Sequence, residues 1–353
     1  MKLLKNGQSG QALIMALILL ALGSLIVVPI LGLAGTSLNY HRVIQRNTLE
    51  TYAADSGVEY ALCELGNNPT QYLAIPLQDN FTLNDKTVNV TAEYLGNNIF
   101  KIISTATTDS GSSTSIESYV EIIPGLFGSA ITVTNGDLHI EDSSVDGDVY
   151  ASGEVTLEDS QVTGTITEYG TLEFPPLDID PYKQEALGGG TINGNLVLGT
   201  GTHNLEPKYI TGYLKIEEGA TVTMDGTVYV EGSVTMSENR SIHIEAGANL
   251  TGTGNFIAEN GNIKIELSRF ELDNIPLVAA INGNIEKGEQ CEYIKAILYA
   301  PNGDVKLENI VVYGAVFGKT VTLVENATII YPSEGESDLI GSGEVNILTH
   351  NIN

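Results

Sequence analysis

An uninterrupted apolar segment, Ala12–Ala34, constrains this chain more than any other feature of its sequence. Its 23 residues include no Asp, Glu, Lys or Arg. A bilayer core of about 30 Å matches about 20 apolar residues in a helix, because each residue adds about 1.5 Å. Pro29, Gly23 and Gly32 lie inside the segment, and membrane helices tolerate such residues. The segment therefore predicts a membrane-spanning helix, and the alternative is an unusually long buried core helix.

Charge is unevenly distributed along the 353 residues, whose formal net charge is −28. No Asp or Glu precedes Glu50, whereas Lys2, Lys5, Arg42 and Arg46 give this region a positive charge. The acidic remainder repels nucleic acid and anionic lipid, so DNA and RNA are excluded as expected partners. Lys2 and Lys5 favour a cytoplasmic N-terminus with the acidic body outside the cell, although the two arginines on the far side weaken this preference.

Two further patterns extend the N-terminal region. Apolar residues recur every three to four positions over Asn39–Leu65, and a Gly-Asn-Asn-Pro turn follows, so one transmembrane and stem helix is predicted over residues 11–66. Three alternating runs, at residues 87–94, 99–107 and 115–123, are separated by short polar turns. They predict a small antiparallel sheet within residues 70–125, packed on the apolar face of the stem.

The N-terminal region resembles a type IV prepilin, and more narrowly the PilX class of minor pilins and pilus-assembly proteins. The resemblance lies in a basic leader over residues 1–10, the apolar helix and the sequence YAADSGVEYAL at Tyr52–Leu62. It implies that a membrane peptidase cuts after Gly10 and leaves Gln11 as the new N-terminus. Major pilins have Phe at the first mature position and Glu at the fifth, where this chain has Gln11 and Met15. These departures suit a minor or pilin-like component, and a plain signal anchor with a helical stalk is the alternative.

From residue 128 to 350 the sequence repeats a glycine, one polar residue and then alternating apolar residues, as in Gly147-Asp148-Val149-Tyr150-Ala151. Equivalent glycines lie 17, 18 or 20 residues apart, which suits one coil of a parallel β-solenoid. Glycine and Asn are expected at the corners because those positions require a positive φ. A Pro-rich insert near residues 172–190 predicts a loop across the solenoid. Asn-Gly pairs leave an antiparallel β-sandwich as the alternative.

The segment from Ala296 to Tyr331 resembles the end of the β-solenoid bodies that are joined to PilX-like N-termini in bacterial surface proteins. It is also distantly similar to the bactofilins, which polymerise. The predicted fold is therefore mainly β: a transmembrane and amphipathic helix, a small antiparallel sheet and a parallel β-solenoid.

The sequence contains no catalytic signature. His139 and His243 are expected to face solvent from the middle of strands, and the five histidines lack the spacing of a zinc site. Acidic residues are too common for any pair to indicate a glycosidase, and no basic cluster is apparent around Arg240 or Arg269. The prediction is no enzyme, no cofactor and no metal. The turn containing Asp142, Asp146 and Asp148 is interpreted as a solvated acidic corner, and Cys63 and Cys291 as buried thiols without a disulfide.

These observations predict a structural protein of the bacterial surface, anchored by one helix in the bilayer. It would be a minor-pilin-like component of a type IV pilus or related assembly that displays the solenoid for adhesion or assembly. Its expected partners are the lipid bilayer, pilin or pilus-assembly subunits and a carbohydrate or other surface ligand. The alternative is a membrane-tethered β-helix protein that binds or cleaves polysaccharide.

Overall fold

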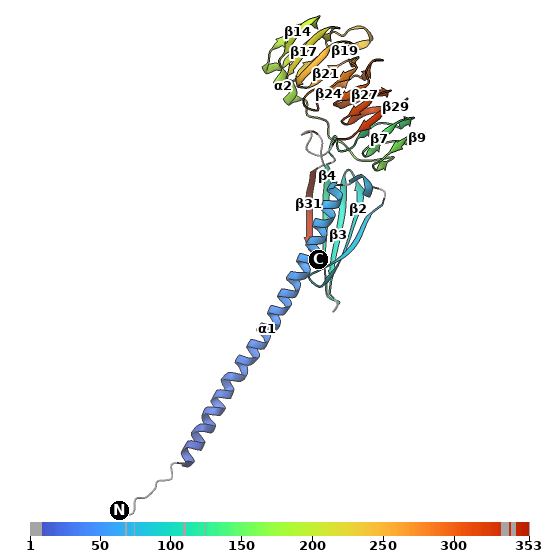
Figure 1. Cartoon of the computed structure of the whole chain (residues 1–353). Coiled ribbons are helices and arrows are strands. Elements are labelled where there is room, and N and C mark those ends of the chain that lie inside the picture. The colour runs from blue at the N-terminus through green and yellow to red at the C-terminus, as the bar shows by residue number, and fades with distance from the viewer. Residues whose placement is uncertain are drawn as a thin grey trace, which may run out of the picture.

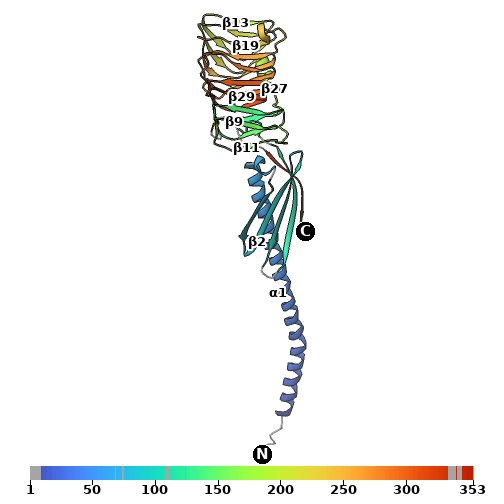
Figure 2. The same cartoon turned by 90° about the vertical axis from the view of Figure 1, so that its right-hand side faces the viewer.

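The computed structural model describes residues 9–67, 69–73, 75–108, 111–123, 125–332, 339 and 344–352. The molecule is elongated: a long helix leads into a small sheet, and a β-solenoid follows at the far end (Figures 1 and 2). The expected fold class is confirmed. The helix and the small sheet form one core, and the interior of the solenoid forms another.

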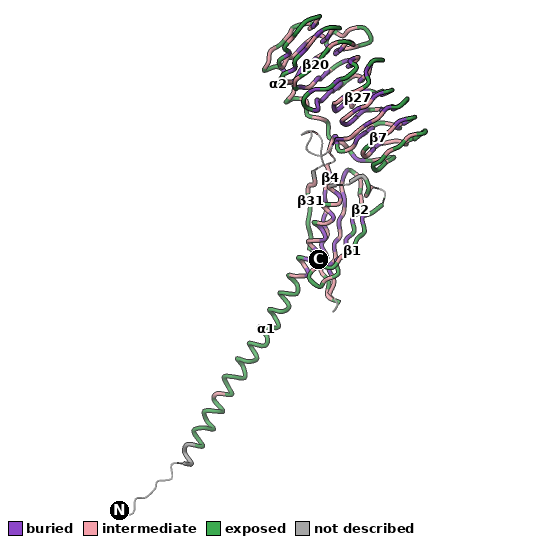
Figure 3. The backbone as a smooth tube through the Cα atoms, in the orientation of Figure 1, coloured by how far each residue is buried: buried purple, intermediate pink, exposed green. Residues whose placement is uncertain are grey.

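Helix α1 (Ser9–Asn67) is continuous and contains Pro29. Its side chains from Leu13 to Thr48 are almost all exposed, and burial begins at Glu50 (Figure 3). Small residues then face the sheet, and a Cβ atom at Gly57 would lie 2.1 Å from Ser104 Oγ. Close packing of the helix on the sheet therefore explains the small residues of the YAADSGVEYAL sequence.

The small sheet has the strand order β1-β2-β3-β4-β31, and all its pairs are antiparallel. Buried and exposed side chains alternate along β2, β3 and β4, and the buried set packs on α1. The 3-10 helix η1 (Pro69–Tyr72) joins α1 to the sheet. The strands are β1 (Leu77–Leu83), β2 (Lys86–Gly96), β3 (Ile99–Thr107), β4 (Ser113–Ile123) and β31 (Glu344–Ile352).

The assignment of residues 128–350 to the solenoid needs correction at its C-terminal end. Strand β31 leaves the solenoid and pairs with β4, with Glu344 opposite Ile123. The solenoid is thus inserted between two neighbouring strands of the small sheet. An alternating strand can pair with any compatible edge, so its sequence does not reveal this distant partner.

The solenoid is built from parallel strands in three sheets. A 17-stranded sheet contains two strands of most coils, and the third face consists of a six-stranded and a three-stranded sheet. Paired residues are 17 apart at Leu138 and Val155, 18 apart at Leu196 and Leu214, and 20 apart at Ile285 and Val305. The remaining elements, in chain order, are β5 (Ile131–Val133), β6 (Leu138–Glu141), β7 (Ser144–Asp146), β8 (Val149–Ala151), β9 (Val155–Glu158), β10 (Gln161–Val162), β11 (Ile166–Thr167), α2 (Asp180–Gly188), β12 (Thr191–Ile192), β13 (Leu196–Leu198), β14 (Gly201–Leu205), β15 (Lys208–Ile210), β16 (Leu214–Ile216), β17 (Ala220–Asp225), β18 (Val228–Val230), η2 (Ser237–Asn239), β19 (Arg240–Ile244), β20 (Asn249–Thr253), β21 (Phe256–Asn260), β22 (Asn262–Ile265), β23 (Arg269–Phe270), β24 (Leu277–Asn282), β25 (Ile285–Lys287), β26 (Tyr293–Lys295), β27 (Ile297–Glu308), β28 (Val311–Tyr313), β29 (Val316–Val324) and β30 (Thr328–Ile330).

The coils do not stack in the order of the sequence. Strands β5 and β6, from the first coil, pair with β29 of the last coil. The chain first forms the coils nearest the small sheet and then crosses the solenoid to its far end. There β12 begins the series of coils that returns to β29 (Figure 1).

Close stacking explains several repeat glycines better than backbone conformation does. Gly136 and Gly194 have the expected positive φ, whereas Gly283 and Gly303 do not. A Cβ atom at Gly303 would lie 1.9 Å from the carbonyl oxygen of Gly283 in the preceding coil. The polar residue after the glycine also links coils, because Asn284 Oδ1 accepts a hydrogen bond from the Asp304 backbone N–H at 2.9 Å.

Candidate binding groove beneath a crossing strap

A column of large side chains runs along one outer face of the solenoid. Tyr209 pairs in register with Tyr229, and Tyr299 pairs with Phe317. Tyr150 belongs to the same column, although its strand comes from the other end of the solenoid sequence. Ring centroids of Tyr299 and Phe317 lie 5.0 Å apart, and the Tyr209 and Tyr229 rings are stacked. Such a column would be an exposed apolar stripe without a cover.

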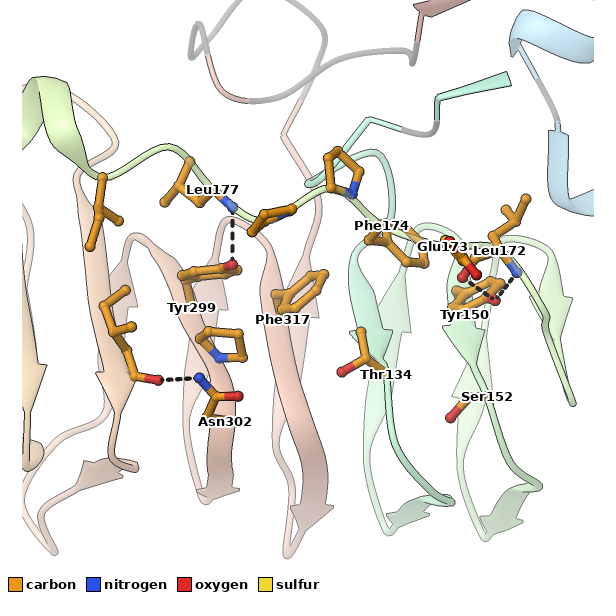
Figure 4. Close-up of a pocket in the computed structure, with 15 residues that line it drawn as sticks. Thr134, Tyr150, Ser152, Leu172, Glu173, Phe174, Leu177, Tyr299, Asn302 and Phe317 are labelled. Carbon is orange, nitrogen blue, oxygen red and sulfur yellow. Dashed lines mark hydrogen bonds between the residues drawn. The ribbon is translucent and has the colours of Figure 1, made fainter. Parts of the chain in front are cut away.

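The chain supplies that cover with residues 172–179, here called the strap. Phe174 of the strap packs edge-on against Tyr150 and Phe317, with ring centroids 5.0 and 5.9 Å away (Figure 4). The hydroxyl of Tyr150 accepts a hydrogen bond from the Leu172 N–H at 2.8 Å, and the Tyr299 hydroxyl accepts one from the Leu177 N–H at 3.2 Å. Burial raises the pKa of Tyr150 to about 12, so this phenol remains protonated at neutral pH.

Helix α2 continues the strap and is fixed by charged contacts. Lys183 Nζ lies 2.9 Å from Glu259 Oε2, which also accepts a hydrogen bond from the Tyr229 hydroxyl. Burial opposes ionisation of Glu259, but the hydrogen bonds from Lys183 and Tyr229 prevail and hold its pKa below the usual value. Glu185 accepts hydrogen bonds from the Thr227 hydroxyl and backbone N–H, at 2.6 and 3.1 Å. The strap is therefore fixed on the solenoid at both ends.

A groove of about 640 Å³ lies between the strap and the solenoid face (Figure 4). This volume is typical of small-ligand sites. Apolar and aromatic side chains dominate its lining, and Thr134, Ser152 and Asn302 add polar groups. Among the described residues that line the groove, Glu173 is the single carboxylate, so they do not include the paired carboxylates of a glycosidase. The complete lining is Thr134, Tyr150, Ser152, Leu172, Glu173, Phe174, Pro175, Pro176, Leu177, Ile179, Ile281, Tyr299, Pro301, Asn302 and Phe317.

The sequence analysis did not identify this groove. A usable signal was present, because the sequence Gly-x-Val-aromatic occurs in three coils and places Tyr150, Tyr229 and Phe317 at the same position of the repeat. Recognising that these aromatic residues share one face would have revealed the column. The order of the coils was also required to bring Tyr150 beside Phe317, and the repeat alone does not specify that order.

The residues singled out from the sequence lie elsewhere. Gly10 and Gln11 are in the first turn of α1, and residues 1–8 of the expected leader lie outside the described residues. Asp146 and Asp148 accept hydrogen bonds at 2.7 Å from the Thr163 hydroxyl and the Thr165 N–H, so they link neighbouring coils. Among the described residues, no group of three His, Cys, Asp or Glu side chains is arranged to hold a metal ion.

Three expectations about individual side chains were wrong. His243 is 9% exposed rather than solvent-facing, and its Nε2 lies 3.3 Å from Glu266 Oε2. Cys63 is exposed, whereas Cys291 is buried as expected, and no disulfide joins them. Arg240 does have basic neighbours, because a shallow pocket brings it together with lysines that the sequence separates. The charged residues of this pocket are Glu238, Arg240, Lys264, Glu286, Lys287, Lys306 and Glu308.

By its own structure the chain belongs to a class of β-solenoid proteins that carry an N-terminal apolar helix. Residues 178–336 of this chain match the family model of a domain of unknown function, DUF7305. That match begins in the strap and ends just after the solenoid. No curated protein matches the chain.

Three solved structures are similar in part. The competence-associated pilin ComZ from Thermus thermophilus is 12% identical with a TM-score of 0.31, over 87% of this chain and 97% of that chain. The glycosylated ice-binding protein LeIBP from an Arctic yeast is 16% identical with a TM-score of 0.31, over 59% and 94%. An ice-binding protein from the Antarctic ascomycete Antarctomyces psychrotrophicus is 11% identical with a TM-score of 0.23, over 60% and 97%. At such low TM-scores, these similarities do not assign a function to this chain.

Proposed function

We propose that the protein is a non-catalytic, pilin-like structural component of the bacterial cell surface that uses α1 as a membrane anchor and displays the solenoid. The observation that supports this proposal best is the change in environment along one continuous helix. The N-terminal part of α1 exposes its apolar side chains, with a mean hydropathy of 2.9 in its most apolar window, whereas the C-terminal part forms the core of the small sheet. A bilayer would surround the apolar side chains of the N-terminal part of α1, just as the small sheet covers those of its C-terminal part.

The same geometry suits a pilin-like role. The solenoid lies at the end of the molecule opposite the apolar part of α1, so an anchored chain would hold it away from the bilayer (Figure 1). Lys2 and Lys5 favour a cytoplasmic N-terminus despite Arg42 and Arg46 on the far side of the apolar segment, and the solenoid would then be outside the cell. Removal of the leader after Gly10 would leave Gln11 at the start of α1, where the apolar helix is free to pack with those of other subunits.

The test is the N-terminal sequence of the membrane-extracted protein, with and without an active prepilin peptidase. We expect a start at Gln11 that requires the peptidase and is lost in a Gly10→Val variant. A Ser9→Val variant, changed one residue earlier, is the matched control and retains cleavage. An intact Met1 in the presence of active peptidase would overturn the pilin-like role and leave a tethered solenoid.

The groove favours polysaccharide binding as a second candidate function. Aromatic rings beside a few hydroxyl and amide groups suit an uncharged sugar, which presents both C–H faces and hydroxyl groups. With Glu173 as its single carboxylate, the groove supports binding rather than cleavage. Neutral and acidic oligosaccharide panels test this function. We expect a neutral glycan to bind wild-type protein and a Thr134→Val variant to weaken that binding. The matched variant Thr223→Val, on another face, should not weaken it, and the absence of any glycan ligand would refute the candidate.

A further inference from the structure

The coil farthest from α1, residues 189–205, leaves part of the solenoid core uncovered, although Leu198 and Leu205 of this coil are buried. Within the described part of the chain, its strands β12, β13 and β14 each pair on one side only, with β15, β16 and β17 respectively. Ile192 and Leu196 are partly exposed, whereas their register partners Ile210 and Leu214 are fully buried. A Cβ atom at Gly194 would meet no described atom within 4 Å. We call residues 189–205 the tip coil.

The tip coil also lacks charge. No Asp, Glu, Lys or Arg occurs between Glu185 and Glu206, although the chain as a whole has a net charge of −28. Proteins usually protect open strand edges with charged side chains, because an unprotected edge pairs readily with another strand. Val197 is 46% exposed on this unprotected edge.

The opposite end of the solenoid provides a comparison within the same molecule. Strands β9, β10 and β11 also pair on one side only among the residues that the structure describes. Here Glu154, Glu158, Asp159 and Glu168 are all exposed along the edge. The two ends share a fold and a repeat but differ in charge, so the lack of protection is specific to the tip coil.

We propose that the tip coil is a self-association surface on which two copies of this chain pair edge to edge. A second copy is favoured by charge, since two acidic bodies repel each other least where both contact surfaces are uncharged. It is also favoured by geometry. A twofold axis beside the open edge of β14, the longest open strand of the tip coil, and normal to its sheet places β14 antiparallel to its copy, and antiparallel edges can exchange hydrogen bonds.

Tip-to-tip pairing places the two α1 helices at the far ends of the pair, away from the contact, because α1 and the tip coil lie at opposite ends of each molecule (Figures 1 and 2). If α1 is an anchor, the pair joins two separately anchored molecules and can bridge two membranes or fibres. This bridging rests on the proposed function, whereas the pairing itself does not. The tip coil would then provide contact between like cells without a separate receptor.

The experiment uses the full chain reconstituted at one copy per lipid nanodisc, analysed by light scattering and electron microscopy over a range of concentrations. We expect wild-type protein to form pairs of discs. Association of α1 helices within a single disc cannot produce such pairs. A variant with Val197→Lys and Thr202→Lys should pair about tenfold more weakly or worse, since each new charge occurs twice in a symmetric contact. The matched variant with Leu157→Lys and Gln161→Lys, on the opposite edge, should pair as wild type does.

Single discs at every concentration for wild type would overturn the proposal and leave the tip coil open to a different partner. Equal pairing by the tip variant, or equal loss in both variants, would also overturn it. Circular dichroism confirms that each variant is folded. A chain that fails to enter discs would instead contradict the anchor, and pairing would then be measured on the chain in detergent.

Discussion

Single residues determine how closely the coils stack. At Gly303 the neighbouring carbonyl leaves no room for a Cβ atom, whereas at Gly199 the nearest atom to an added Cβ would be a glutamate oxygen 3.4 Å away. Both glycines lie in the solenoid and neither has a positive φ. The difference between them is therefore one of space, which makes them a matched pair.

We expect Gly303→Ala to lower the free energy of unfolding by about 1–3 kcal/mol, because the added methyl group forces two coils apart. Gly199→Ala should change it by less than about 0.5 kcal/mol. Chemical denaturation of the two variants measures the difference. Equal stability of the two variants would show that the coils can separate without cost.

The two cysteines offer a second test at this scale. Burial raises the pKa of Cys291 to about 11, so this thiol is both inaccessible and protonated at pH 8. Alkylation of native protein at pH 8 should modify Cys63 and leave Cys291 unmodified until the solenoid unfolds, as peptide mass spectrometry will show. Rapid modification of Cys291 in native protein would contradict the packing around it.

The strap and α2 depend on the ion pair between Lys183 and Glu259. The pH range over which this pair stabilises the protein follows from the directions of the two pKa shifts. The pKa of Glu259 lies below its ordinary value of 4.5, and that of Lys183 lies above 10.5. The stabilisation from a lowered carboxyl pKa is present above about pH 4.5 and is lost as the pH falls through the folded value. The stabilisation from a raised lysine pKa is present below about pH 10.5 and is lost as the pH rises through the pKa of the folded state.

We therefore expect α2 to loosen before the coils when the pH is lowered from 6 to 3. The loss is about 1 kcal/mol, or about fivefold in amide exchange after correction for intrinsic rates. Hydrogen-exchange mass spectrometry of peptides from α2 and from β24 provides the measurement. Glu259→Gln should remove most of the acid sensitivity of α2, and an unchanged profile in that variant would assign it to another group.

Elements with local signals could be predicted from the sequence, and those that depend on distant pairing could not. The periodicity of Ala53, Val58 and Leu65 indicates a helix wherever it occurs, and the repeat glycines define the coils. In contrast, the apolar residues around Val345 follow the pattern of any β-strand. Nothing in the local sequence therefore assigns β31 to the small sheet. The groove requires Tyr150 beside Phe317, which depends on the same kind of distant pairing.

At the scale of the whole molecule, the solenoid is an insertion. Strands β4 and β31 are antiparallel neighbours, and Ile123 pairs with Glu344 where the chain leaves and re-enters the small sheet. The two connections therefore emerge side by side. The small sheet and α1 form a core separate from that of the solenoid.

A chain in which an Asn-Gly turn joins residue 123 directly to residue 344 should therefore retain a folded small sheet, because two antiparallel neighbours need only a hairpin. Circular dichroism and cooperative unfolding of this chain in detergent measure the outcome. A matched chain that lacks residues 344–353 instead should lose cooperative unfolding of the sheet. Loss of cooperativity in the hairpin chain would show that the sheet depends on the solenoid.

The insertion also has a consequence for biosynthesis. A ribosome makes the chain from the N-terminus, so α1 and β1–β4 emerge long before β31, and domains tend to fold as they emerge. The edge of β4 must wait for β31, which is translated after every coil. A chain that terminates before β31 thus contains the apolar helix but lacks the fifth strand of the small sheet. Completion of the sheet next to α1 therefore marks a chain in which every coil of the solenoid has been synthesised.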